Sequence, residues 1–173
     1  VSMLAVAYPG LPPIRRSGAK VGDTLLVTGP LGGSLLGRHL SFTPRVREAK
    51  RIAETLGRSV HAMMDISDGL SLDLHRLCKA SGVGATLDES SLEEVISIES
   101  VELAKRDGRS PLGHVLSDGE DFELLLAVDP EGFQSVNNVT LFRVGAITHS
   151  TLQIRGLDGI IGPLEPRGFE HHT

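Results

Sequence analysis

The sequence predicts an α/β (α+β) fold, a layered domain in which a mixed β-sheet is flanked by helices. Short apolar runs typical of strands alternate along the chain with segments whose apolar residues recur at helical spacing. The 173 residues, 40% hydrophobic and 23% charged, fall in the globular range rather than the disordered or fibrous one. This length suffices for one well-packed core.

The chain begins inside an apolar segment. Residues 1–7 read VSMLAVA, and the Pro-rich stretch YPGLPP follows them. We expect residues 1–14 to be the end of a preceding domain and its connector, and residues 15–173 to form a C-terminal α/β domain.

The first half of the chain then alternates between strands and helices. The run TLLVT predicts a strand at residues 24–28, and the glycine-rich residues 29–34 predict a loop. We expect a second strand at residues 61–65. Two helices are predicted, at residues 45–57 and from Leu70 to Gly82, and each ends on a glycine. The apolar face of the first helix comprises Val46, Ala49, Ile52, Ala53 and Leu56.

The second half continues the alternation. Residues 83–87 predict a strand, and residues 92–105 carry mixed helical signals. The run FELLLAV, residues 122–128, is the clearest strand pattern in the chain. We expect a short helix near residues 131–136, then strands near residues 139–147 and 152–155, before a tail rich in Gly and Pro.

Composition excludes several classes of partner and site. The net charge is −5, and no dense Lys/Arg block is interleaved with aromatic residues, so we expect neither nucleic acid nor an anionic membrane as a partner. No apolar run reaches the roughly 18 residues of a membrane span, which makes the cytoplasm the expected compartment. The one cysteine, Cys78, is expected to be a buried spectator.

Two common nucleotide-binding signatures are absent from the sequence. The glycine-rich loop GPLGGS, residues 29–34, lacks the lysine that a P-loop needs, and no G-x-G-x-x-G follows a strand. The seven histidines form no zinc-binding pattern.

The stretch MMDISDGLSLDLHRL passes from a strand through DISDG into a helix. On one interpretation, Ser67 or Asp68 is the helix N-cap and Gly69 permits a tight turn. That interpretation leaves Asp65 unexplained, because a carboxylate at the end of an apolar strand is costly to bury unless it is paired or coordinated. We favour the alternative, in which Asp65 and Asp68 bind Mg²⁺.

A second acidic stretch, SDGEDFE at residues 117–123, precedes the clearest strand. It fits a polar turn built on Asp118 and Gly119. Its four carboxylates within six residues equally fit a site, since they repel one another unless they are solvated or bound to cations or donors. The sequence leaves both interpretations open.

Four stretches together resemble the C-terminal domain of the thiamine-monophosphate kinase family, in the family's order over residues 15–171. They are RRSGAKVGDTLLVTGPLGGSLLG, MMDISDGLSLDLHRLCKASGVGATLDE, LSDGEDFELLLAV and RGFEHH. The family belongs to a superfamily with aminoimidazole ribonucleotide synthetase, selenophosphate synthetase and a hydrogenase maturation factor. Ser117 and Asp118 depart from its pattern, because a small pair such as Gly-Gly is common there.

The resemblance implies a role for particular residues. Asp65 and Asp68 resemble Mg²⁺ ligands, Ser67 a contact to an ATP phosphate, and Arg16 an arginine that reaches ATP. The remaining residues implied, all on the substrate side, are Glu120, its neighbour Asp121, and Phe169, which would pack on the thiamine moiety.

The resemblance also implies transfer of the γ-phosphoryl of ATP to thiamine monophosphate, giving thiamine diphosphate without a covalent enzyme intermediate. An N-terminal domain would dimerise and hold most of the Mg²⁺-ATP site, with the C-terminal domain closing over it. Since that N-terminal half is missing here, we expect these 173 residues alone to be inactive. The alternatives are another ATP-dependent enzyme of the superfamily, of the selenophosphate synthetase or hydrogenase maturation type, or a non-catalytic nucleotide- or ligand-binding module.

Overall fold

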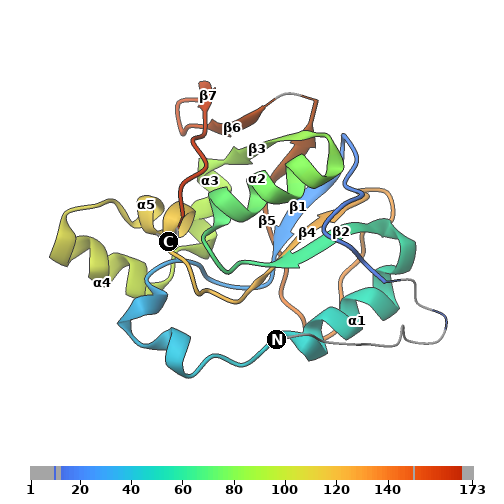
Figure 1. The fold of residues 1–173 in the computed structure, drawn as a ribbon, viewed down its shortest axis with the longest axis horizontal. Coiled ribbons are helices and arrows are strands. Elements are labelled where there is room, and N and C mark those ends of the chain that lie inside the picture. The colour runs from blue at the N-terminus through green and yellow to red at the C-terminus, as the bar shows by residue number, and fades with distance from the viewer. Residues whose placement is uncertain (1–9, 11–12, 150, 169–173) are drawn as a thin grey trace, which may run out of the picture.

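The computed structural model describes Gly10, residues 13–149 and residues 151–168. Its strands are β1 (Thr24–Val27), β2 (Val60–Asp65), β3 (Gly84–Asp88), β4 (Leu124–Val128), β5 (Phe142–Thr148), β6 (Leu152–Arg155) and β7 (Ile161–Pro163). Its α-helices are α1 (Val46–Leu56), α2 (Leu70–Ser81), α3 (Glu89–Leu92), α4 (Ile98–Asp107) and α5 (Pro111–Ser117). Figure 1 shows their arrangement.

Among the described residues the strands form one seven-stranded sheet in the order β2-β4-β1-β5-β3-β6-β7. Neighbouring strands pair antiparallel, except that β3 and β6 run parallel. The expected mixed sheet is therefore confirmed. Strands β2 and β4, which flank the two acidic stretches, are direct neighbours, with Asp65 opposite Leu124.

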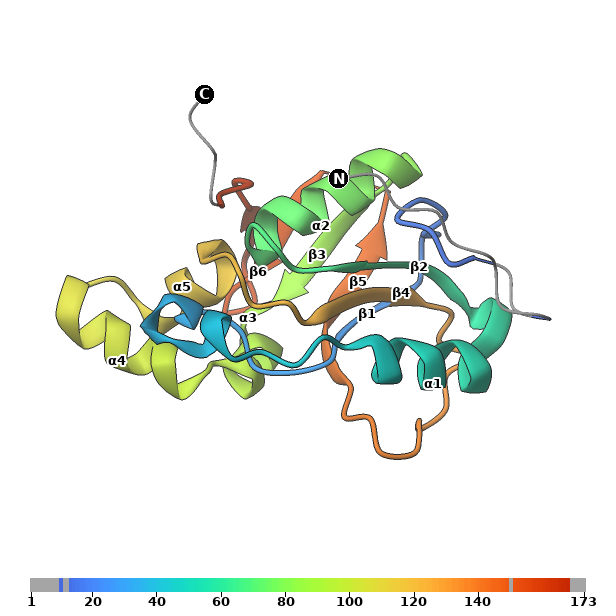
Figure 2. The same ribbon diagram turned by 60° about the horizontal axis from the view of Figure 1, so that its bottom comes forward.

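Helices cover both faces of this sheet. Figure 2 shows α2 on one face and α1 on the other, with α3, α4 and α5 gathered at one end. Alternation along β1 explains the layers, because Leu25 and Val27 pack in the core cluster under α2 whereas Leu26 packs with Ile52 of α1. The layered α/β architecture follows the sequence prediction.

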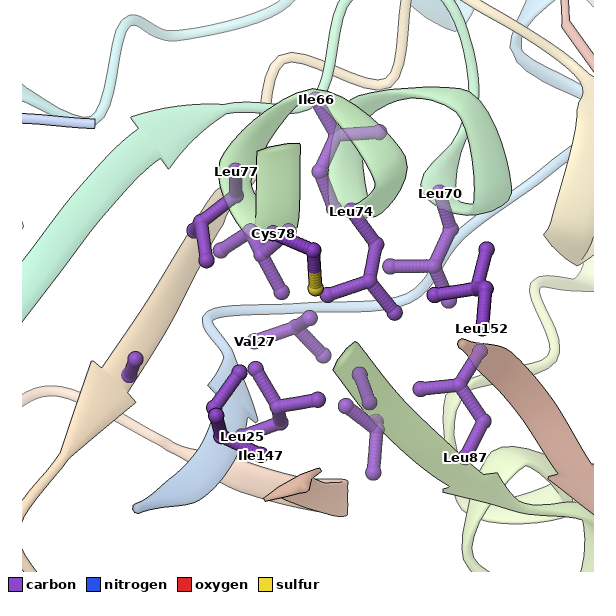
Figure 3. Close-up of a cluster of buried hydrophobic side chains, with 14 of the residues drawn as sticks. Leu25, Val27, Ile66, Leu70, Leu74, Leu77, Cys78, Leu87, Ile147 and Leu152 are labelled. Atoms are coloured by element: carbon purple, nitrogen blue, oxygen red, sulfur yellow. The ribbon is translucent and has the colours of Figure 1, made fainter. Parts of the chain in front are cut away.

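The core under α2 fixes the position of the helix that follows DISDG. Leu70, Leu74, Leu77 and Cys78 point from α2 onto the sheet, where they meet strand residues such as Leu87 (Figure 3). The three leucines of α2 and Leu87 are fully buried. Burial of a leucine side chain contributes about 1.5–3 kcal/mol, so the start of α2 is held firmly over the sheet.

Several sequence-based expectations need correction. No helix forms near residues 131–136. A turn forms at the start of this segment, where the Asp129 carboxylate accepts from the Glu131 N–H, and another at its end, where Val139 N–H donates to Val136 O. Val46, expected on the buried face of α1, is 71% exposed, since it lies at the first helical residue beyond the edge of the core.

The expected strand at residues 122–128 begins two residues late. Phe122 has φ of 53°, a left-handed conformation that a strand residue cannot adopt, so β4 starts at Leu124. The mixed helical segment at residues 92–105 contains the last residue of α3, a short 3-10 helix at Glu93–Val95 and most of α4. Ser97 begins α4 by accepting a hydrogen bond from Ser100 N. Helix α5 and strand β7 were not predicted.

Candidate functional site

The DISDG turn connects β2 to α2. Neither Ser67 nor Asp68 caps the helix, contrary to one interpretation of the sequence; the N-cap is Gly69, with φ of 116°. The buried carboxylate of Asp73 replaces such a cap by reaching back along the helix. Its Oδ2 accepts hydrogen bonds from the Ser67 and Asp68 N–H groups, at 2.9 and 2.8 Å. Asp73 therefore sets the shape of the turn.

The two carboxylates predicted to bind metal lie in different environments. Asp65 is exposed at the end of β2, so the expected cost of burying it does not arise. Asp68 is half-buried and accepts a hydrogen bond from Arg76 Nη1, which also bonds Asp73 Oδ1 at 2.7 Å. The bond to Asp68 is the main reason that the pKa of the Arg76 guanidinium is raised. Arg76 thereby orients Asp68.

The two acidic stretches, distant in sequence, are joined through their backbones. Glu120 N–H donates to Ser67 O at 2.7 Å, and Phe122 N–H donates to Ile66 O at 2.9 Å. Gly119 permits this approach, since a Cβ there would lie 2.7 Å from Ser67 O. Both stretches stand out in the sequence, but nothing in the sequence predicted that they meet.

The carboxylates of the second stretch divide into three that point inward and one that points outward. Asp118, Asp121 and Glu123 are buried, whereas Glu120 is exposed, and no hydrogen bond or ion pair of its side chain is found among the described residues. Glu120 also has φ of 64°. The stretch is therefore a turn in which three carboxylates are anchored inside the protein and the fourth, that of Glu120, is exposed to solvent.

Asp121 is anchored to the glycine-rich loop. The Gly32 N–H lies 2.9 Å from both of its carboxylate oxygens, and Arg38 Nη2 donates to Oδ1 at 2.6 Å. Burial raises the pKa of Asp121 to about 7, although the Gly32 and Arg38 hydrogen bonds lower it. Its carboxylate is fully enclosed, so a direct contact to a ligand would require the loop to move.

Glu123 and Asp118 are anchored in the same way. Glu123 accepts from Thr28 Oγ1 at 2.6 Å and from Arg45 Nε and Nη2 at 2.8 and 2.6 Å. Asp118 accepts from the Gly33 N–H at 3.0 Å. The GPLGGS loop and the arginines that follow it thus hold the acidic turn, a role for this loop that the sequence did not reveal.

A pocket of about 730 Å³ opens beside the joined turns. One wall is α5 with Arg109, and the other is the segment of residues 163–168, which in Figure 1 runs from β7 towards α5 and the start of α2. Ser71 of α2 fixes that segment by bonding both the N–H and the C=O of Arg167. Gly119 and Gly168 line the pocket, and Glu120 and Phe169 follow them in the chain.

The remaining predicted site residues are less defined. Arg16 is exposed, in a segment that runs along the edge of β2 through a bond from Met63 N–H to Arg15 O. Phe169 lies outside the described residues. Within the described ranges no group of three or more His, Cys, Asp or Glu side chains could hold a metal ion. Asp65 and Asp68 each offer a carboxylate near the DISDG turn, and this type of donor suits Mg²⁺, which commonly takes one or two carboxylates and completes its shell with water and phosphate; Asp68 is also bonded by Arg76.

This chain is an α/β domain in which a strand-to-helix acidic turn is braced by a second acidic turn. The chain belongs to the family described as AIR synthase related protein, C-terminal domain, whose model matches residues 20–137. In the described part of the chain, no helix combines the length and apolar character needed to cross a membrane.

Relatives refine this assignment. The chain is 44% identical over 164 residues to thiamine-monophosphate kinase of Rhodopirellula baltica, covering 92% of this chain and 51% of the relative. It superposes on AaThiL complexed with AMPPCP and TMP with a TM-score of 0.75 at 28% identity, covering 92% and 54% of the two chains. It shares its fold with Escherichia coli HypE, a hydrogenase maturation protein, at a TM-score of 0.69, 19% identity, and coverage of 91% and 53%. The chain spans about half the length of the curated relatives it matches.

Proposed function

We propose that this chain is the substrate-side part of an ATP-dependent thiamine-monophosphate kinase, which transfers the γ-phosphoryl of ATP to thiamine monophosphate. The observation that carries the proposal is the meeting of the two acidic turns beside a pocket of about 730 Å³. The identity of 44% to a thiamine-monophosphate kinase supports the substrate. The similarity to AaThiL complexed with AMPPCP and TMP supports a site that takes both a nucleotide and this substrate.

We assign the nucleotide side to the DISDG turn. Asp65 and Asp68 would hold Mg²⁺, which when bound neutralises charge on the reacting phosphates. The turn also leads into the N-terminus of the twelve-residue helix α2, where free N–H groups and the helix dipole favour a phosphate. Ser67 in that turn and Arg16 at the edge of β2 would contact ATP.

We assign the acceptor side to Glu120 and Phe169, which follow two residues lining the pocket. Glu120 is exposed and available to the substrate, whereas the Asp121 carboxylate is enclosed by Gly32 and Arg38. Asp121 therefore acts on the substrate indirectly, by fixing the turn that carries Glu120. Direct transfer needs no protein nucleophile, only held reactants and charge stabilisation.

The proposal includes partners beyond this chain. A second domain, within the roughly half of the relatives' length that this chain does not cover, would supply the rest of the ATP site and dimerise, and the enzyme would act in the cytoplasm. The 173 residues alone would then bind substrates weakly and not turn over.

The test is formation of thiamine diphosphate from thiamine monophosphate, ATP and Mg²⁺ by the full-length protein beside the 173-residue chain. We expect turnover by the full-length protein only. Asp65→Asn and Asp68→Asn should each lower kcat by about 100-fold or more, because a bound metal supplies several kcal/mol of charge stabilisation. Glu131→Gln, an exposed carboxylate on the turn after β4, is the matched control and should leave kcat unchanged.

The outcomes separate the alternatives. Turnover by the 173-residue chain would refute the need for a second domain. Normal rates in both Asp variants would refute the metal assignment. If the full-length protein binds ATP but does not phosphorylate thiamine monophosphate, assays with the acceptors of selenophosphate synthetase and of the hydrogenase maturation type come next, and a non-catalytic binding module remains if those also fail.

A further inference from the structure

Arg109 is held rigidly at the wall of the pocket by the two residues that depart from the family's small pair. Its Nη1 donates to Asp118 Oδ1 at 3.2 Å, and its Nη2 donates to Ser117 Oγ and to Gly113 O at 3.0 Å. His114 Nδ1, 2.9 Å from Asp118 Oδ2, anchors that carboxylate from the buried side. The guanidinium is thus fixed in direction, not a free surface charge.

Arg109 nevertheless remains accessible from the pocket. Its side chain is 46% exposed, while the Asp118 side chain that orients it is only 7% exposed. Arg109 lies across the pocket from the segment of residues 163–168, which Ser71 fixes in place. A ligand between these walls would therefore meet the guanidinium without any rearrangement.

The charge around the Arg109 guanidinium indicates which kind of ligand atom it can bind. Arg109 and Asp118 form an ion pair, so this wall of the pocket carries little net charge that would attract a phosphate. The three hydrogen bonds found among the described residues leave two of the five guanidinium N–H groups available as donors. Such a wall suits an uncharged hydrogen-bond acceptor with a flat ring, which a fixed guanidinium can both bond and stack on.

Thiamine monophosphate carries such a group at the end remote from its phosphate, the aminopyrimidine with its two ring nitrogens. Its phosphate must reach the DISDG turn, where the proposed metal ligands Asp65 and Asp68 lie. The pyrimidine is then the part left to occupy the pocket between α5 and residues 163–168.

We propose that Arg109, oriented by Ser117 and Asp118, determines acceptor specificity by donating a hydrogen bond to a pyrimidine nitrogen of thiamine monophosphate. This inference rests on the proposed kinase function. It assigns a role to the Ser117-Asp118 departure, which that function alone does not use.

The experiment compares Arg109→Ala and Arg109→Gln in the full-length protein with Arg106→Ala, an exposed arginine at the end of α4, as the matched control. We expect Arg109→Ala to raise KM for thiamine monophosphate about 10- to 100-fold, the worth of a hydrogen bond to a charged donor, with kcat changed less than about threefold. Arg109→Gln keeps a donor and should lose less. The control should match the wild type.

A truncated ligand locates the contact. The thiazole phosphate half of the substrate lacks the pyrimidine, and its inhibition constant against thiamine monophosphate should be the same in wild type and Arg109→Ala. If Arg109→Ala weakens the binding of both ligands equally, Arg109 binds the phosphate. If the KM for thiamine monophosphate is unchanged, Arg109 binds neither part. Each of these results overturns the inference while leaving the kinase function intact. Absence of thiamine-monophosphate phosphorylation in the wild type would instead overturn the proposed function. Far-UV circular dichroism checks that each variant is folded.

Discussion

The buried carboxylate of Asp121 predicts that the protein loses stability as the pH rises. Burial raises its pKa from 3.8 to about 7, so the folded protein holds a proton that the unfolded chain has released at the same pH. Because the folded state binds more protons between these two values, the free energy of unfolding falls as the pH rises through that range. The stabilising effect is complete below the unfolded pKa and is lost as the pH passes the folded one.

The magnitude follows from the two pKa values. At 1.36 kcal/mol for each pKa unit, the difference between 3.8 and about 7 corresponds to about 4 kcal/mol in total. About 3 kcal/mol of this falls between pH 5 and pH 8.5, according to the linkage relation. The carboxylate is fully enclosed, so solvent does not weaken the effect.

The assay measures urea unfolding of wild type and Asp121→Asn at both pH values, followed by far-UV circular dichroism because the chain has no tryptophan. The wild-type unfolding free energy minus that of the variant should fall by about 3 kcal/mol between pH 5 and pH 8.5, since asparagine does not titrate. Glu131→Gln controls for a carboxylate that is exposed. If the difference instead grows with pH, the ion pair with Arg38 outweighs burial, and the reasoning is refuted.

Three further predictions concern the core and the turn. Cys78, whose pKa burial raises to about 11, should react with iodoacetamide at pH 8 at least about 100-fold more slowly in the folded protein than in urea; equal rates would show that the thiol is accessible. Leu74→Ala should lower the unfolding free energy by about 3–5 kcal/mol, measured by urea titration, with a loss under 1 kcal/mol contradicting the packing under α2. Glu120→Gly should leave the unfolding free energy unchanged or raise it by up to about 1 kcal/mol, because glycine adopts the left-handed φ without strain, while turnover by the full-length protein falls. A destabilised variant would show that the glutamate side chain supports the fold.

The fold could be predicted from sequence where local patterns and tertiary packing agree. The helical spacing of Leu70, Leu74 and Leu77 and the stop at Gly82 fix α2 within a residue, because the same leucines form the core. Residues 131–136 carry a similar local signal, but Gly132 and the Asp129 cap favour a turn there. Local propensity decides only where no stronger side-chain bond competes with it.

The candidate site was predicted as two separate acidic stretches, and the sequence could not show that they meet. Their contact is made by backbone groups of residues 66–67 and 120–123, which carry no side-chain signature. No role for Asp73 was predicted from the sequence, although its carboxylate shapes the DISDG turn by accepting from two backbone N–H groups. One signal of the contact was present in the sequence: Gly119, within the second acidic stretch, is the residue type required where two backbones approach closely.

In the acidic turn, residues whose carboxylates are anchored to arginines alternate with residues whose backbone is left-handed. This alternation accounts for the strain in the backbone. Asp121 and Glu123 point inward to Arg38 and Arg45. Glu120 and Phe122 adopt left-handed φ values of 64° and 53°; the Glu120 side chain is exposed, and the Phe122 ring stacks on Phe42. A left-handed conformation costs a bulky residue about 1–3 kcal/mol, and it persists only where the surroundings determine it. Here the bonds from two partly exposed arginines to the buried carboxylates, together with the backbone bonds to the DISDG turn, do so. The backbone at Glu120 is therefore fixed before any ligand arrives, which places the base of its exposed side chain for the proposed contact to the acceptor substrate.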